Sequence, residues 1–147
     1  MKLITRNTDY AMRALCYIAR KKGDSVTVTE MVEELDIPKP FLRKILQTLS
    51  SEGLLESQKG LGGGFSLALP EEKILLTDLI RIFQTSIRLN ECIFKKRLCP
   101  NRATCLLKRE IDDIEADVLS RLKKITIASL IKNKTAPFAR SHSHGHR

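Results

Sequence analysis

Residues 39–69 have the sequence KPFLRKILQTLSSEGLLESQKGLGGGFSLAL, and this stretch decides the fold class. From Pro40 to about Ser51 the apolar residues recur as they do on one face of an α-helix, and proline suits the first helical turn. Gly53 then ends the helix. Two strand-like runs follow, residues 54–58 and 65–69, separated by the glycine-rich segment KGLGGG at residues 59–64. The pattern predicts a helix followed by a β-hairpin.

The predicted helix has two chemically different sides. Its buried face is expected to consist of Phe41, Leu42, Ile45, Leu46 and Leu49. The other side carries cationic and hydrogen-bonding side chains, which can reach phosphates and base edges. These candidate DNA-binding residues are Lys39, Arg43, Lys44, Gln47, Thr48 and Ser51. An ordinary amphipathic helix with a solvated face is the alternative interpretation.

Two further helices are predicted before this one. Thr8 or Asp9 can cap the first, which ends near Gly23, and residues 26–28 resemble a short strand. Thr29 can cap a second, short helix, and residues 36–38 form a turn because the residue before Pro38 disfavours helical backbone. A short helix, a tight turn and a longer helix with a cationic outer side are typical of a helix-turn-helix.

The glycine loop favours the same interpretation. Its glycines let the backbone lie close to a phosphate or within a minor groove, so Lys59, Gly60 and Leu61 become candidate DNA contacts in a wing. A phosphate loop for a nucleotide would open a helix and end in Lys followed by Ser or Thr. Here a strand follows and that ending is missing.

A long helix is predicted from about Thr104 to Lys124, after a helix capped by Thr77. Its apolar residues step by three or four positions, which is typical of a seam for a partner helix. These residues are Leu107, Ile111, Ile114, Val118, Leu122 and Ile125.

The chain therefore divides into four predicted parts. They are a winged helix-turn-helix over residues 1–84, a cysteine loop over residues 85–105, a dimerisation helix with a short following helix over residues 104–132, and a disordered tail over residues 133–147. The expected fold is mostly α with a small β wing.

Composition favours an anionic partner, because the 147 residues carry a net charge of +9. The excess is uneven: residues 1–70 hold 10 basic and 8 acidic side chains, and residues 71–147 hold 16 and 9. DNA binding by the first part would depend on placed charges. No apolar run is long enough to span a membrane and no signal peptide is evident, so we expect a cytoplasmic protein.

Cys92, Cys99 and Cys105 are spaced C-x6-C-x5-C in a basic loop that runs into the long helix. Three thiolates this close can converge on one metal centre, and the surrounding cations offset their charge. The spacing differs from that of zinc fingers. Free thiols or a redox disulfide are the alternative. Cys16 lies inside the first helix, near its apolar stripe, and is expected to be a buried structural residue.

Together these motifs resemble the Rrf-type bacterial regulators typified by IscR, NsrR and RirA. The resemblance rests on TDYAMRAL at residues 8–15, on KGLGGGF at residues 59–65 and on the three-cysteine loop, and it covers residues 1–132. It implies a winged-helix homodimer joined through the long helix. It also implies a [2Fe-2S] or [4Fe-4S] cluster on Cys92, Cys99 and Cys105 that reports iron, redox or nitric oxide status.

The resemblance also bears on a fourth ligand. IscR-like members have a histidine three residues after the third cysteine, where this chain has Lys108. NsrR-like members use an aspartate early in the first helix, supplied by the other subunit, and Asp9 stands at the matching place. Asp9 could equally be a helix-start residue favoured by the helix dipole.

The sequence thus predicts a non-enzymatic, homodimeric transcription factor, a repressor whose operator binding depends on a labile iron–sulfur cluster. A zinc-stabilised DNA-binding protein without a sensing role is one alternative. A redox or electron-transfer protein is another, although no catalytic dyad or cofactor loop is found.

Overall fold

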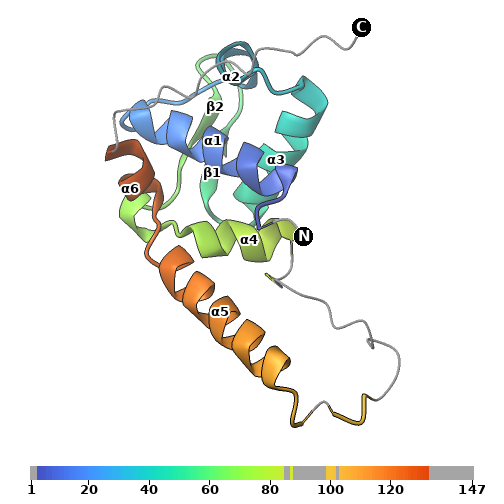
Figure 1. Cartoon of the computed structure of the whole chain (residues 1–147). Helices are drawn as coiled ribbons and strands as arrows, with labels where there is room; N and C mark the ends of the chain where they lie inside the picture. Colours follow the sequence, from blue (N-terminus) through green and yellow to red (C-terminus); the bar gives the residue numbers. More distant parts are fainter. Residues whose placement is uncertain (1–2, 85–86, 88–98, 102, 133–147) are drawn as a thin grey trace, which may run out of the picture.

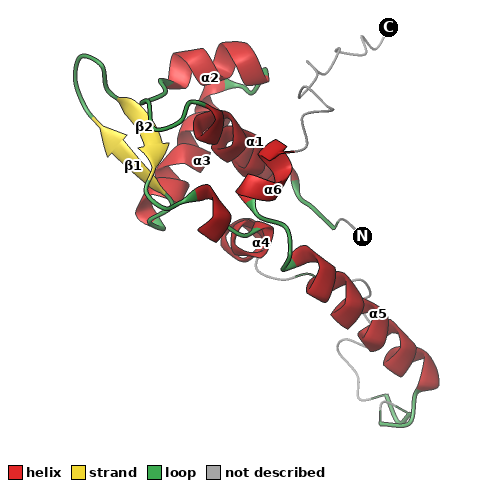
Figure 2. Ribbon diagram, turned by 90° about the vertical axis from the view of Figure 1, so that its left-hand side faces the viewer, coloured by secondary structure: helices red, strands yellow, loops and turns green. Residues whose placement is uncertain are grey.

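The computed structural model describes residues 3–84, 87, 99–101 and 103–132. Helices dominate, and the only sheet in these ranges is a two-stranded antiparallel hairpin (Figures 1 and 2). This confirms the predicted fold class. In chain order the elements are α1 (Arg6–Arg20), α2 (Val28–Leu35), α3 (Lys39–Ser51), β1 (Leu55–Gln58), β2 (Gly64–Leu67), the 3-10 turn η1 (Glu71–Lys73), α4 (Leu76–Gln84), α5 (Leu106–Leu122) and α6 (Ile127–Lys132).

Helix α1 lies at the centre of the folded body and contacts α2, α3, α4, α6 and β2. Small side chains make this possible, because Ala11 and Ala14 are fully buried and let neighbouring helices approach closely. Leu15 and Ile18 continue the buried face. The core is aliphatic, as expected for a chain with few aromatic residues.

Helix starts differ from the predicted positions by a few residues. Thr5, and neither Thr8 nor Asp9, caps α1, because its hydroxyl accepts from the Thr8 backbone N–H. Thr27 in place of Thr29 caps α2, accepting from Glu30 N–H at 3.2 Å. Helix α4 begins at Leu76, one residue before the expected cap Thr77.

Helices α2 and α3 form the predicted helix-turn-helix. Asp36 ends α2 in a left-handed conformation, with φ of 53°, and its N–H donates to Val32. Ile37 is buried in the turn, and Pro38 precedes α3. The left-handed residue reverses the chain sharply, which brings α3 against α2 and α1.

Strands β1 and β2 pair in antiparallel register from Leu55↔Leu67 to Gln58↔Gly64, and β1 also packs on α3. The strand expected at residues 26–28 is reduced to one bridge. Val26 and Phe65 exchange both backbone hydrogen bonds, at 2.9 and 2.8 Å, before α2 begins at Val28. This bridge ties the hairpin to the segment between α1 and α2.

Helix α5 projects from the body, while α6 returns to it beside α1 (Figures 1 and 2). The C-terminal end of α5 is anchored by a short bridge in which Leu76 N–H donates to Ile125 and Ile127 N–H donates to Ile74. The predicted long helix is thus observed, slightly shorter than expected. The predicted tail lies outside the described residues.

Candidate nucleic-acid interface and cysteine site

The outer side of α3 is the most cationic surface of the helix-turn-helix. Lys39, Arg43, Lys44, Gln47 and Ser51 are exposed, and Thr48 is half-buried. Helix α3 contains no acidic residue, so a phosphate approaching it would meet only attractive charge. Sequence reasoning placed these side chains on the correct side of the helix.

Two hydroxyl groups on α3 are already engaged with its own backbone. Thr48 Oγ1 donates to the Lys44 carbonyl at 2.9 Å, and Ser51 Oγ donates to the Thr48 carbonyl at 2.9 Å. Their oxygens can still accept a hydrogen bond, whereas within the described part of the chain the side chains of Arg43 and Gln47 donate no such bond to the backbone of α3.

One expected core residue of α3 is exposed. Phe41 was predicted to be buried with Ile45, four residues later, but 56% of its area is accessible. The buried face is narrower than predicted, because Leu42, Ile45, Leu46 and Leu49 alone fill it. Phe41 therefore lies at the margin of the cationic side, near the N-terminal end of α3.

The wing places Lys59, Gly60 and Leu61 in solvent, and Leu61 is fully exposed. Gly60 and Gly62 have φ of 95° and 75°, values that side chains disfavour. The turn is closed by Gly63 N–H donating to the Gly60 carbonyl at 3.0 Å. The glycines thus present a compact turn with a cation and an apolar side chain beside it.

A surface cluster fixes α2 against α1. Tyr17 OH donates to Glu30 Oε1 at 2.8 Å, and Lys21 Nζ lies 2.7 Å from the same oxygen and 5.1 Å from the Tyr17 ring. These two partners lower the pKa of Glu30, and the Glu30 carboxylate raises the pKa of Lys21. The cluster holds the first helix of the helix-turn-helix in place.

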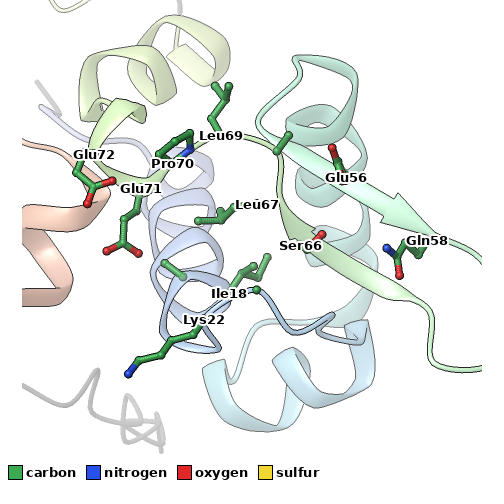
Figure 3. Close-up of a pocket in the computed structure, with 13 residues that line it drawn as sticks. Ile18, Lys22, Glu56, Gln58, Ser66, Leu67, Leu69, Pro70, Glu71 and Glu72 are labelled. Atoms are coloured by element: carbon green, nitrogen blue, oxygen red, sulfur yellow. The ribbon is translucent and has the colours of Figure 1, made fainter.

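A groove of about 640 Å³ lies between the end of α1, the hairpin and the start of η1 (Figure 3). Ile18 and Leu67 are among its apolar lining residues. Three carboxylates, Glu56, Glu71 and Glu72, line it with a single cation, Lys22. This lining repels phosphate, which distinguishes the groove from the outer side of α3.

Two of the three predicted cluster ligands fall within the described residues, and Cys92 does not. Cys99 and Cys105 are both free and half-buried. Cys105 is the N-cap of α5, and its Sγ accepts from the Lys108 backbone N–H at 3.4 Å. Lys108 Nζ is paired with Asp112. In the part of the chain described, no three metal-binding side chains gather into one site.

The fourth predicted ligand lies elsewhere in the molecule. Asp9 is in the first turn of α1, and its Oδ2 lies 2.9 Å from Arg13 Nε. The N-terminal end of α5 lies far from α1 in both views (Figures 1 and 2). The structure of one chain therefore does not bring Asp9 beside Cys105.

Cys16 has a different environment from Cys99 and Cys105. It is fully buried in the core, as predicted, and burial raises the pKa of its thiol to about 11. Arg20 opposes this shift and Glu71 adds to it, both to a smaller extent. A thiol of this kind stays protonated and makes a poor metal ligand at neutral pH.

Sequence reasoning missed a polar network at the start of α1. Thr8 is fully buried and donates to Gln84 Oε1 at 2.9 Å, while Thr5 N–H donates to the same oxygen at 3.0 Å. Gln84 Nε2 donates to the Leu3 carbonyl at 3.0 Å. The last residue of α4 thus holds the first turn of α1, the turn that contains Asp9.

The fold and the cationic helix define the class of winged-helix transcriptional regulators. The model of the Rrf2 family, described as an iron-dependent transcriptional regulator, matches residues 4–133, so the chain belongs to this family. It is therefore a regulator of transcription and not an enzyme.

A sequence relative supports this family assignment, and solved structures share the fold. The chain is 32% identical over 136 residues to the HTH-type transcriptional regulator NsrR of Bacillus subtilis, covering 91% of this chain and 92% of that one. CymR, the global cysteine regulator of B. subtilis, has a similar structure, with a TM-score of 0.75 and 21% identity over 90% of this chain and 98% of that one. IscR of T. potens has a TM-score of 0.69 and 21% identity, with 93% of each chain covered.

None of the helices in the described ranges has both the length and the apolar character needed to cross a bilayer.

Proposed function

We propose that this Rrf2-family regulator is a homodimeric repressor whose binding to operator DNA is controlled by a labile iron–sulfur cluster. The observation that carries the proposal is the contrast between the cysteines. Cys105 caps the projecting helix α5, Cys99 lies six residues before it in the chain, and both are half-buried, whereas Cys16 is sealed in the core.

The donor set suits such a cluster. Cys92, Cys99 and Cys105 would hold it, and a bound cluster would supply an iron centre that reacts with oxidants or nitric oxide. Cys105 also caps α5, so the direction of its sulfur is tied to the helix axis. Lys108 is paired with Asp112, and the resemblance to NsrR-like members makes Asp9, contributed by the partner subunit, the predicted fourth ligand.

The dimer interface is proposed to be the seam of α5. Leu107 and Ile114 are 68% and 50% exposed, and Ile111 and Val118 are half-buried. Leu122 alone on this seam is buried within the described chain, at the anchored end. Pairing two seams would remove this apolar surface from water.

The control of DNA binding follows from thermodynamic linkage. Ligand binding at the cysteines can change operator affinity only if the two dimer conformations hold the cysteines differently. A ligand set shared between the α5 tip of one subunit and α1 of the other meets this condition. Through Thr8 and Gln84, the position of α1 is also coupled to the rest of the body.

The test is the visible spectrum and metal content of anaerobically purified protein. We expect brown protein with matching iron and sulfide, and loss of the colour in Cys92→Ala, Cys99→Ala and Cys105→Ala. Cys16→Ala is the control and should retain the spectrum. Colourless protein containing zinc would favour the zinc-stabilised alternative and contradict the proposal.

DNA binding is tested with an operator selected from random duplexes. Arg43→Ala and Gln47→Ala should each weaken specific binding by about 1–3 kcal/mol if each reads a base. Lys59→Ala should weaken binding to all sequences and reduce its salt dependence. Unchanged affinity in all three variants would overturn the assignment of the interface.

A further inference from the structure

We propose that Phe41 reads the C5-methyl group of a thymine in the major groove and is a specificity-determining residue of this regulator. The inference rests on the proposed function, because it requires α3 to enter a major groove. It extends that function by naming an apolar contact beside the polar ones.

The first observation is the exposure of an aromatic side chain without a packing role. Phe41 is 56% exposed and is absent from the residues that pack against the core. Among the described residues it is the only exposed aromatic side chain. An apolar ring left in water gains free energy if a partner covers it, so Phe41 is available for such a contact.

The second observation is where Phe41 lies. It is the third residue of α3, and the N-terminal residues of a recognition helix are those that meet base edges. Lys44 and Thr48 follow it by three and seven positions, so the three share one side of the helix. Phe41 therefore has groups suited to DNA beside it on one side.

The third observation is that the exposed apolar side chains of the proposed dimer interface lie on a different element. The exposed seam side chains Leu107 and Ile114 belong to α5, which packs on α4. Phe41 belongs to the helix-turn-helix, where neighbouring side chains are cationic. A subunit interface through α5 leaves Phe41 uncovered.

The chemistry of the major groove then identifies the ligand. Its floor presents hydrogen-bond donors and acceptors and one apolar group, the thymine methyl. Arg43 and Gln47 can satisfy the polar groups, while the phenyl ring of Phe41 can cover the methyl. Contact of this kind distinguishes T·A from C·G without a hydrogen bond.

The experiment replaces thymine by deoxyuridine, which removes only the methyl group, at each position of the selected operator. For the wild-type protein we expect about fourfold weaker binding per contacted methyl at one or two positions. Phe41→Ala should bind the thymine and uracil sites equally there. Phe41→Leu should retain part of the discrimination.

Leu61→Ala is the matched control, since Leu61 is also an exposed apolar residue but lies in the wing. It should weaken binding and keep the thymine-to-uracil ratio of the wild type. Far-UV circular dichroism should confirm that Phe41→Ala is folded, as expected for an exposed side chain.

The outcomes separate the two proposals. If the wild type selects no sequence, the proposal that α3 reads DNA is overturned, and the assignment of Phe41 is overturned with it. If it selects a sequence and Phe41→Ala keeps the full uracil penalty, only the Phe41 assignment is overturned. A gain of affinity seen only with 5-methylcytosine would assign the contact to the methylated base and contradict the thymine assignment.

Discussion

Thr8 is the only fully buried polar residue in the described part of the chain, and Gln84 satisfies its hydroxyl. Thr8→Val keeps the shape of the side chain and removes the hydroxyl that joins Thr5 to Gln84. We expect the free energy of unfolding to fall by about 1–3 kcal/mol in urea titrations. Thr29→Val, at an exposed position of α2, should change it by less than about 0.5 kcal/mol. Equal effects would contradict a role for the network.

Asp9 has a structural and a proposed ligand role, which one pair of variants separates. Asp9→Ala and Arg13→Ala both break the same partly exposed ion pair, and the loss of this pair should cost at most about 0.5 kcal/mol of stability. Only Asp9→Ala removes the carboxylate. We expect faster loss of the visible absorption and weaker coupling to DNA affinity in that variant alone. Identical behaviour of the two variants would leave Asp9 a helix-start residue.

The Cys16 thiol gives stability a specific dependence on pH. Its pKa is about 11 in the folded chain and 9.0 ordinarily, so the unfolded chain releases this proton first as pH rises. The contribution of Cys16 to stability is therefore constant below pH 9 and is lost between pH 9 and about 11, by about 1.4 kcal/mol per pH unit. When urea unfolding is measured at pH 8 and at pH 10, the free energy of unfolding of reduced wild type should fall by about 1 kcal/mol more than that of Cys16→Ala. Parallel losses in both proteins would contradict this origin.

Among the secondary-structure elements, the hairpin depends most sharply on glycine. A Cβ on Gly64 would lie 2.4 Å from the Val26 carbonyl oxygen, whereas a Cβ on Gly62 meets no atom within 4 Å. Gly62→Ala should therefore cost only its backbone strain, about 1 kcal/mol. Gly64→Ala must also separate β2 from Val26 and should cost at least twice as much. Thermal unfolding of the two variants tests this order, and equal midpoints would contradict it.

Elements were easier to predict than their ends. The order of helices and strands follows from apolar spacing and glycine positions, which are local signals. The caps of α1 and α2 were placed two to four residues late because several polar residues compete there. Tertiary contact decides between them: Gln84, 76 residues away, takes the Thr8 hydroxyl and leaves Thr5 as the cap.

For the candidate site, the sequence likewise predicted the side of the helix but not every side-chain contact. Helical periodicity correctly separated Arg43 and Gln47 from Leu42 and Ile45. It failed at Phe41, whose angular position lies at the edge of the apolar face, so only the surrounding packing determines its burial. No local signal shows that Asp9 pairs with Arg13 or that Cys105 caps α5.

At the scale of the whole molecule, the projecting seam predicts how the chain assembles. Ile114→Glu places a charge in the proposed interface and should give monomers, because an unpaired buried charge is strongly destabilising. Ala116→Glu is the matched control, since it lies on the opposite side of α5 and is already exposed. Sedimentation velocity should show a dimer for wild type and Ala116→Glu. A dimeric Ile114→Glu of normal stability would contradict the seam.

The anchoring of α5 also has a mechanical consequence. The helix has 17 residues, so its tip lies about 25 Å from its base. The base is held by the hydrogen bonds that join Ile125 and Ile127 to the start of α4. Because α5 is held at its base, a displacement of about 2 Å at Cys105 corresponds to a rotation of the helix about its base of only about 5°. A displacement at the tip therefore produces only a small movement at the base, and little of it can reach α3 along the helix. The proposed link from the tip to α1 of the partner subunit would not pass along this helix, so it would act directly on the body that carries α3.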